Sequence, residues 1–301
     1  MREIVVVSGK GGTGKTSLTA AFADLARYAV VCDLDVDAAD LHLLLQPLEE
    51  RREIFISGHE AVIDPDACTG CGACAAMCLF GAVRSAGGVY RVNPLRCEGC
   101  KVCVAFCPSG AVSFPDKRCG EWFVGNTRFG TMVHARLHPG AENSGRLVSL
   151  LKKEARGIAT RDGREIILCD GAPGIGCPVI SSLSGADVAV IVTEPTPSGL
   201  HDLERVLELC GHFRTPACVI INKCDLSHGM AEKIGSRCRA GGHEVVAHLP
   251  HDEIVFEAML TGRAVTEMPD SPFTDVLRRA WKRITILSEK GGDARVPAIN
   301  Q

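Results

Sequence analysis

A glycine-rich turn stands between a short apolar strand and a helix near the start of the chain. The turn reads Gly9-Lys10-Gly11-Gly12-Thr13-Gly14-Lys15-Thr16, which satisfies the pattern G-x4-G-K-[ST]. The β-branched run Ile4–Val7 precedes it, and the residues from Ser17 to Ala26 have helical character. Glycines at this spacing let backbone N–H groups converge on phosphate oxygens, and the helix adds its positive N-terminal end. The sequence therefore predicts a nucleotide-phosphate site.

Each polar residue of the turn has an expected role at the phosphates. We expect Lys15 to reach the β- and γ-phosphates and the Thr16 hydroxyl to bind Mg²⁺. The alternative is a glycine-rich turn without a ligand, but the strand before it and the helix after it favour the phosphate site. The nucleotide-binding residues expected in this segment are Gly9, Lys10, Gly11, Gly12, Thr13, Gly14, Lys15, Thr16 and Ser17.

Strands and helices alternate through most of the chain. Strands are predicted at Ala29–Cys32, Glu165–Cys169, Asp187–Thr193, Ala217–Asn222 and Glu244–Leu249, and helices at Ser144–Ala159, Gly199–His212, Met230–Ala240, Asp252–Leu260 and Phe273–Leu287. The stretch 120–145 has a mixed pattern. This order predicts an α/β fold with a doubly wound, mostly parallel sheet.

Acidic residues follow two of the predicted strands, where the phosphate site of a doubly wound sheet lies. Asp33 and Asp35 come after the second strand, and Asp170 comes after the strand Glu165–Cys169. We expect Asp35 and Asp170, with Thr16, to hold Mg²⁺, directly or through water. Asp37 and Asp40 come at the start of the next helix, where capping of that helix is the competing role for Asp37.

The second lysine of the turn, Lys10, gives the deviant form K-G-G-T-G-K-T. In this the chain resembles the MinD/ParA-like class of P-loop ATPases, which includes the nitrogenase iron protein. The resemblance implies a nucleotide-dependent homodimer, or a heterodimer with a related ATPase, in which Lys10 reaches the partner's nucleotide as an arginine finger does. It also implies that Asp35 positions the attacking water. The expected catalytic residues are thus Lys10, Lys15 and Asp35.

The same resemblance places the base pocket in two later turns. In related ATPases the asparagine matching Asn222 binds the adenine edge, and the expected pocket contains Asn222, Lys223 and Pro250. The run from Asn222 to Asp225 spells N-K-x-D, which also resembles the guanine reader of GTPases through Asp225. We expect ATP rather than GTP, because the phosphate loop is of the ATPase type.

Eight of the sixteen cysteines lie in two runs of the form C-x2-C-x2-C-x3-C. Three thiolates at this spacing bind three irons of one cubane, and the fourth cysteine of each run binds the other cluster. One [4Fe–4S] cluster is therefore assigned to Cys68, Cys71, Cys74 and Cys107. The other is assigned to Cys97, Cys100, Cys103 and Cys78. The alternative is zinc, which uses C-x2-C pairs, but a duplicated run with a third cysteine fits cubanes better.

These runs resemble bacterial two-[4Fe–4S] ferredoxins, except that Leu79 replaces the usual proline after the first run. The expected organisation is a discontinuous P-loop ATPase domain, residues 1–60 and 117–301, with a small α+β ferredoxin-like domain inserted at 61–116. Over the whole chain the resemblance is to the MinD superfamily ATPases that contain an inserted ferredoxin domain.

Composition narrows the classes of partner. A net charge of −3 and an aromatic content of 5% argue against a nucleic-acid partner. No apolar run reaches the ~20 residues of a membrane span, and no signal peptide is expected, so a cytoplasmic protein is predicted. The basic residues of the last helix favour a solvated face over membrane binding; they are Arg278, Arg279, Lys282 and Arg283.

The function expected from the resemblance is ATP binding and hydrolysis that couples nucleotide state to electron transfer or to metallocofactor and iron–sulfur assembly. The cofactors are ATP or ADP, Mg²⁺ and two [4Fe–4S] clusters, and the partner is a redox or metallocofactor-assembly protein. Two alternatives remain open. One is a cluster-assembly scaffold or carrier without redox coupling, although the other cysteines form no C-x-x-C pair. The other is a MinD-like positioning or interaction switch with redox-sensing clusters.

Overall fold

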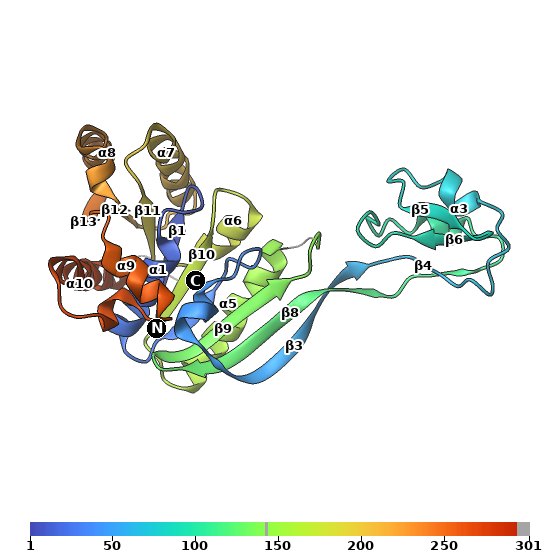
Figure 1. Cartoon of the computed structure of the whole chain (residues 1–301), viewed down its shortest axis with the longest axis horizontal. Helices are drawn as coiled ribbons and strands as arrows, with labels where there is room; N and C mark the ends of the chain where they lie inside the picture. Colours follow the sequence, from blue (N-terminus) through green and yellow to red (C-terminus); the bar gives the residue numbers. More distant parts are fainter. Residues whose placement is uncertain (142–143, 294–301) are drawn as a thin grey trace, which may run out of the picture. The chain divides into compact units, whose positions relative to one another are not determined.

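The computed structural model describes residues 1–141 and 144–293, which form two compact units (Figure 1). The first unit comprises Met1–Glu53, Trp122–Arg136 and the chain from Ser144 onward. The second comprises Ile54–Glu121 and the segment that begins at Leu137. The predicted insertion, 61–116, falls within the second unit, and its bounds stay a prediction.

A nine-stranded sheet runs through the first unit in the order β13-β12-β11-β1-β10-β2-β9-β8-β3. The pairs from β13 to β9 are all parallel. Parallel strands are covered on both faces and read as continuous apolar runs, as in Ile4–Val7, which is fully buried. The strands are β1 (Arg2–Ser8), β2 (Val30–Asp33), β3 (Leu48–His59), β8 (Asp116–Thr127), β9 (Gly130–Leu137), β10 (Ile166–Pro173), β11 (Val188–Thr193), β12 (Ala217–Ile221) and β13 (Glu244–His248).

Helices cover both faces of this sheet, as Figure 1 shows. On one face α1 and α10 share a core, in which Phe22 stacks on Trp281 with ring centroids 5.3 Å apart. On the other face α5, α6 and α7 contact β1, β2, β10 and β11. The predicted doubly wound, mostly parallel fold is confirmed. The helices are α1 (Lys15–Ala26), α2 (Leu41–Leu45), α5 (Ser144–Arg161), α6 (Cys177–Leu183), α7 (Pro197–His212), α8 (His228–Ala240), α9 (Glu253–Leu260) and α10 (Pro272–Asp293), with short 3₁₀ turns at Cys224–Leu226 and Val265–Glu267.

Three features of the sheet and its helices were not predicted. The mixed stretch 120–145 contains the end of β8 and all of β9, which two residues join as a hairpin, and β3 runs from the first unit into the second. The strand predicted to end at Cys169 continues to Pro173, with an irregular register against β1 between Val6 and Ser8. Helix α6 escaped prediction because it has only seven residues and a proline in its first turn.

The second unit is small and has its own core. Strands β4 (Val62–Ile63) and β7 (Val112–Ser113) form one antiparallel pair, and β5 (Val83–Ala86) and β6 (Val89–Val92) form another. Two four-residue helices, α3 (Ala73–Ala76) and α4 (Val102–Ala105), each carry a cysteine, Cys74 and Cys103. The core joins Ile63, Val83 and Val112 to Cys74. The unit is thus α+β, and a ferredoxin-like fold for it stays a prediction.

A buried ionic cluster ties β1 to α5 and α6 in the first unit. The Glu3 carboxylate lies 2.6 Å from Lys152 Nζ and 2.8 Å from an Arg156 nitrogen. Lys152, 3% exposed, also donates to the carbonyls of Ser181 and Ser184, at the end of α6. The charge of Lys152 is therefore matched by one carboxylate and by carbonyls that the helix end leaves without partners.

Replacing Lys152 by methionine removes the positive charge and leaves the Glu3 carboxylate buried with only the half-exposed Arg156. Breaking a buried pair on one side costs about 3 kcal/mol or more. We expect Lys152→Met to lower the free energy of unfolding by about that amount in urea titrations. The control is Lys153→Met, at the exposed neighbouring position, which should change stability by less than about 0.5 kcal/mol. Equal effects of the two substitutions would contradict this account.

Candidate functional site

The glycine-rich loop joins β1 to α1 at the carboxyl edge of the sheet, and the end of β12 holds it in place. Asn222 Nδ2 donates to the Thr13 carbonyl at 2.8 Å, and Lys223 Nζ donates to the Gly12 carbonyl at 3.0 Å. Gly14 has a φ of 88°, and a Cβ there would lie 2.5 Å from Asn222 Nδ2. Only glycine meets both demands, the left-handed backbone and the close approach of Asn222.

Asp170 is the centre of the polar contacts around the loop. Its Oδ1 lies 2.9 Å from Lys15 Nζ and accepts a hydrogen bond from Thr19 Oγ1 at 2.9 Å. Its Oδ2 accepts from Thr16 Oγ1 at 2.8 Å. Asp35 Oδ2 lies 3.6 Å from the same Lys15 nitrogen. The structure thus brings together Lys15, Thr16, Asp35 and Asp170, the residues expected to serve phosphate and Mg²⁺.

Negative charge exceeds positive charge at this point. Burial lowers the pKa of Lys15, but Asp170 and Asp35 outweigh burial and leave that pKa raised. Burial, and then Asp170, raise the pKa of Asp33 well above its usual range, and burial raises that of Asp35. Three carboxylates face one ammonium group, and a divalent cation with oxygen ligands would relieve the imbalance.

Asp33 and its neighbours shape the turn after β2. The Asp33 oxygens accept hydrogen bonds from the backbone N–H of Asp35 at 3.1 Å and of Leu41 at 3.2 Å. The capping role considered for Asp37 is wrong, because α2 begins at Leu41 and Asp40 stands at its cap position without a side-chain bond. Asp33 satisfies that helix start instead. Asp35 is therefore held facing the loop by the backbone of its own turn.

Lys10 is engaged within its own chain. Its Nζ lies 2.5 Å from Glu194 Oε1 and 3.2 Å from Ser198 Oγ, and Lys223 approaches the other Glu194 oxygen at 3.5 Å. Glu194 was not predicted as a site residue. It directly follows β11, and its place at the carboxyl edge of the sheet was the signal that could have found it.

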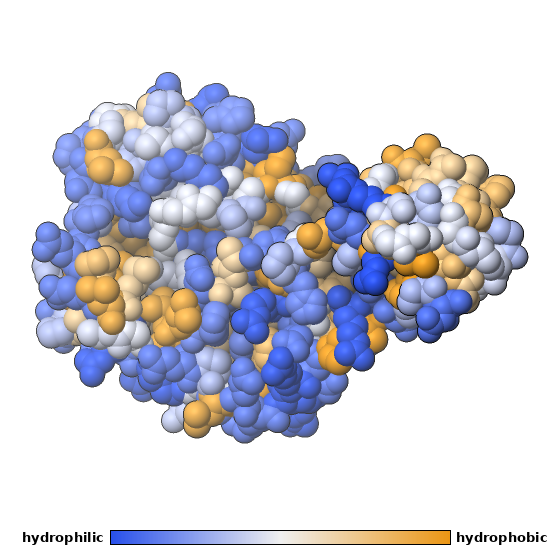
Figure 2. Space-filling model, turned by 45° about the vertical axis from the view of Figure 1, so that its right-hand side comes forward, coloured by the Kyte–Doolittle hydropathy of each residue, from blue (hydrophilic) through white to orange (hydrophobic). Residues whose placement is uncertain are grey.

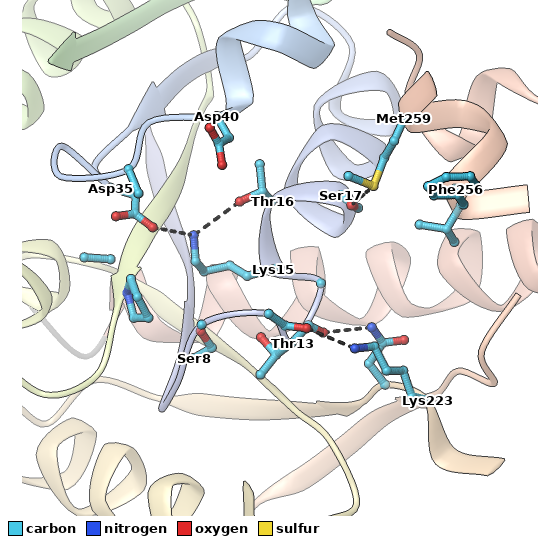
Figure 3. Close-up of a pocket in the computed structure, with 18 of the residues that line it drawn as sticks. Ser8, Thr13, Lys15, Thr16, Ser17, Asp35, Asp40, Lys223, Phe256 and Met259 are labelled. Carbon is cyan, nitrogen blue, oxygen red and sulfur yellow. Dashed lines mark hydrogen bonds and ion pairs between the residues drawn. The ribbon is translucent and has the colours of Figure 1, made fainter. Parts of the chain in front are cut away.

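A cavity of about 660 Å³ opens beside the loop, within the size range of small-molecule sites. Figure 3 shows Lys15, Thr16 and Asp35 at one side and Phe256 and Met259 at the other. Residues predicted for nucleotide binding or catalysis that line it are Gly11, Gly12, Thr13, Gly14, Lys15, Thr16, Ser17, Asp35, Asn222, Lys223 and Pro250. Phe256 and Met259, exposed on α9, were missed.

Several other residues considered at sequence level do not line the cavity. Gly9 packs against α7, where an added Cβ would lie 2.4 Å from Asp202 Cβ. Lys10 and Asp170 act through the contacts described above. Asp225 Oδ1 accepts a hydrogen bond from the His251 backbone N–H at 2.6 Å, so this carboxylate fixes the turn after β13.

Two of the cavities in the second unit are each lined by four cysteines. Cys68, Cys71, Cys74 and Cys107 line one of them. Cys78, Cys97, Cys100 and Cys103 line the other. Within residues 1–141 and 144–293, no three His, Cys, Asp or Glu side chains converge closely enough to hold a single metal ion.

The two cysteine runs repeat in backbone as well as in sequence. Gly70 and Gly99 hold the same position in their runs, with φ values of 70° and 64°. A Cβ at Gly70 would lie 2.5 Å from the Gly88 carbonyl oxygen, and one at Gly99 would lie 2.6 Å from that of His59. The left-handed backbone at these glycines turns each run around its cavity.

The last cysteine of each run receives backbone N–H groups. Burial raises the pKa of Cys78, but hydrogen bonds from the N–H groups of Ala82 and Phe80 lower it overall. The Ser109 hydroxyl is the largest influence that lowers the pKa of Cys107, and backbone N–H groups add to it. Donors of this kind stabilise a thiolate, which is the form that binds a metal.

The second unit also exposes apolar side chains, which Figure 2 shows as hydrophobic surface. Leu79 is 94% exposed, and Leu95, Phe106 and Phe80 are also exposed.

No helix in the part of the chain that the structure describes is long and apolar enough to cross a membrane.

Comparisons with known proteins agree with the geometry of the nucleotide site. Residues 4–265 match the family described as the CobQ/CobB/MinD/ParA nucleotide binding domain. An uncharacterised protein of Methanocaldococcus jannaschii is 32% identical over 224 residues, which cover 73% of this chain and 78% of that protein. A second uncharacterised protein of that organism is 26% identical over 300 residues, which cover 90% of this chain and 93% of that protein.

Solved structures share the fold at low identity. The septum site-determining protein MinD of Pyrococcus horikoshii, complexed with Mg-ADP, has a TM-score of 0.58 and 18% identity, covering 96% of this chain and 98% of its own. The cell division ATPase MinD of Pyrococcus furiosus has a TM-score of 0.55 and 20% identity, and the match covers 95% of this chain and 99% of that protein. At these identities the likeness concerns the fold alone.

The contact between Thr16 and Asp170 predicts a metal-dependent loss on substitution. Thr16→Ala removes the hydroxyl that is expected to bind Mg²⁺ and that donates to the Asp170 carboxylate, and a hydrogen bond to a charged group is worth about 1.5–3 kcal/mol. We expect Mg-ADP to bind about tenfold or more weaker in calorimetry, with little change for ADP measured in EDTA. An equal loss with and without Mg²⁺ would mean that the substitution damages the loop rather than the metal site.

Proposed function

The chain belongs to the CobQ/CobB/MinD/ParA family of nucleotide-binding ATPases, and on that premise we propose an ATP-hydrolysing protein whose second unit carries two [4Fe–4S] clusters. Nucleotide state would be coupled to electron transfer or to the assembly of a metallocofactor on a partner protein. One observation carries the proposal: each of two cavities is lined by the four cysteines expected to share one cluster.

The residues around these cavities fit a cubane better than a single ion. A zinc ion gathers its ligands around one point at ~2.3 Å, whereas the cysteines of a cubane each bind a different iron and stand further apart. The described cysteines do not converge on a single point. Six of the eight cysteines, all but the exposed Cys71 and Cys100, belong to or pack against the small apolar core, and an apolar shell limits the access of water. When bound, the clusters would accept and donate single electrons.

The nucleotide half of the proposal rests on charge and geometry at the loop. Backbone N–H groups of the loop, the start of α1 and Lys15 would bind the phosphates. Asp170 and Thr16 would hold Mg²⁺, and Asp35 would orient the attacking water. The base would occupy the part of the cavity lined by Pro250 and Phe256.

The ion pair between Lys10 and Glu194 bears on the proposed dimer. In one chain Lys10 is satisfied by Glu194 and by Ser198. To reach a partner's nucleotide, Lys10 would have to exchange this carboxylate for the phosphate charge across the interface. Such an exchange of one anionic partner for another costs little electrostatically, so a bound ATP in a second copy could drive it.

Purified anaerobically, the protein is expected to contain about eight iron and eight sulfide per chain, with a [4Fe–4S] signal after reduction. Cys71→Ser should lower the iron content by about half, because Cys71 lines only one of the two cavities. Cys119→Ser is the matched control, since Cys119 is a buried cysteine of the second unit that lines neither of these two cavities. The proposed clusters would be overturned if Cys119→Ser lowered the iron content as much as Cys71→Ser does. They would also be overturned if the purified protein contained stoichiometric zinc instead of iron.

Lys15→Ala should separate the two halves of the molecule. Lys15 contacts only groups of the nucleotide site, so we expect nucleotide binding to fall below detection while the iron content is unchanged. Calorimetry with Mg-ADP and iron analysis of the same sample measure both. Loss of the clusters on this substitution would contradict the modular picture.

Lys10→Ala should leave the dissociation constant of the nucleotide within about threefold of the wild-type value, because Lys10 does not line the cavity of its own chain. ATP hydrolysis should fall by a factor on the order of 10³, as for loss of an arginine finger, and the ATP-dependent dimer should not form in light scattering. Glu194→Gln, which keeps Lys10, should still dimerise. Wild-type hydrolysis by Lys10→Ala would remove Lys10 from the mechanism.

A further inference from the structure

The two cysteine runs differ in the residue that stands two positions after the fourth cysteine. After the fourth cysteine, the first run continues Leu79-Phe80-Gly81-Ala82-Val83 and the second continues Pro108-Ser109-Gly110-Ala111-Val112. Gly81 and Gly110 have similar φ values, 60° and 65°, so the two turns follow the same path. Phe80 of the first turn therefore corresponds to Ser109 of the second.

Ser109 contacts the cysteine of its own turn. Ser109 Oγ lies 3.6 Å from Cys107 Sγ, within hydrogen-bond distance for sulfur. A cysteine that binds iron is a thiolate and can only accept, so the hydroxyl must be the donor. Phe80, at the corresponding position, has no hydroxyl, and the donors that lower the pKa of Cys78 are backbone N–H groups, those of Ala82 and Phe80 first.

The side chains that line the two cavities extend this difference. Thr69, Tyr90 and Ser109 bring three hydroxyl groups to the cavity of Cys107. The cavity of Cys78 has Phe80 and Phe114, together with Glu98 and Lys101, whose charges are opposite in sign. Hydroxyl groups thus occur among the residues that line the cavity of Cys107, and none occurs among the described residues that line the cavity of Cys78.

We propose that Ser109 sets the order in which the two clusters are reduced, a role that rests on the proposed function. A reduced cluster carries one more negative charge, part of it on the cysteine sulfurs. A hydrogen-bond donor to such a sulfur therefore stabilises the reduced form more than the oxidised form and raises the potential. The cluster held by Cys68, Cys71, Cys74 and Cys107 then has the higher potential, and an electron entering the unit settles there.

The test is a potentiometric titration of the anaerobically purified full-length protein, followed by EPR. Two one-electron steps are expected in the wild type. Ser109→Ala should lower the equilibrium constant of the more positive step by about threefold to tenfold, where tenfold is about 59 mV, and leave the other step unchanged. Ser109→Thr, which keeps a hydroxyl at this position, should retain the wild-type potential of the more positive step. Since Ser109 is exposed, the substitution leaves no buried gap.

Two further variants separate the hydroxyl from a change in shape. Phe80→Ser places a hydroxyl beside Cys78 and should raise the more negative step, whereas Phe80→Ala removes the ring without adding a donor and serves as its control. Ser113→Ala, on β7, removes a hydroxyl that bonds to the Val62 carbonyl and should move neither step.

The outcomes are distinguishable. Two clusters whose steps do not move in Ser109→Ala, or move together, would overturn the role of Ser109 and leave the proposed function standing. A shift of the more negative step alone would reverse the assigned order and also overturn the proposal. Absence of any cluster signal in the wild type would contradict the proposed function, and this inference with it.

Discussion

The contacts of the Asp170 carboxylate organise the start of α1 beside the phosphate loop, because Lys15, Thr16 and Thr19 are all positioned through it. Asp170 is 1% exposed and lies within the central strand β10, between β1 and β2. A carboxylate so deeply buried must be matched by donors, and the donors are Lys15, Thr16 and Thr19, all on the first turns of α1. The same contacts place the phosphate loop and leave surplus negative charge for a divalent cation.

The sheet also gives the nucleotide site a covalent connection to the second unit. Strand β2 ends at Asp33, whose oxygens shape the turn that carries Asp35. Its neighbour β9 is joined to β8 by a short turn, and β3, β8 and β9 are the strands through which the chain passes between the two units. A nucleotide that changes the charge around Asp33 and Asp35 therefore acts at the end of β2, the strand that pairs with β9. This topology is the physical basis for coupling in our account.

Sequence reasoning found the features that depend on local pattern. The phosphate loop, the acidic residues at strand ends and the cysteine runs each have a fixed spacing, and the structure brings the corresponding side chains together.

Sequence reasoning missed the features that depend on tertiary context. Strands β3 and β9 carry charged and polar residues, and His134 of β9 is buried only because it stacks between His42 and Phe123. Burial, with His42 and Arg136, lowers the pKa of His134 to about 4, a neutral state that no local pattern indicates. Glu194 was missed because a single carboxylate after a strand has no motif of its own.

The central claim is that nucleotide state and electron energy are coupled in one chain. Its most direct test is an anaerobic redox titration of the wild-type protein, followed by EPR, with and without Mg-ATP. Our account predicts that Mg-ATP moves at least one cluster potential by more than about 30 mV, which is ~0.7 kcal/mol for one electron. Coincident curves from a protein shown to hold both clusters and to bind ATP would contradict it, because clusters that do not respond to the nucleotide cannot be gated by it energetically.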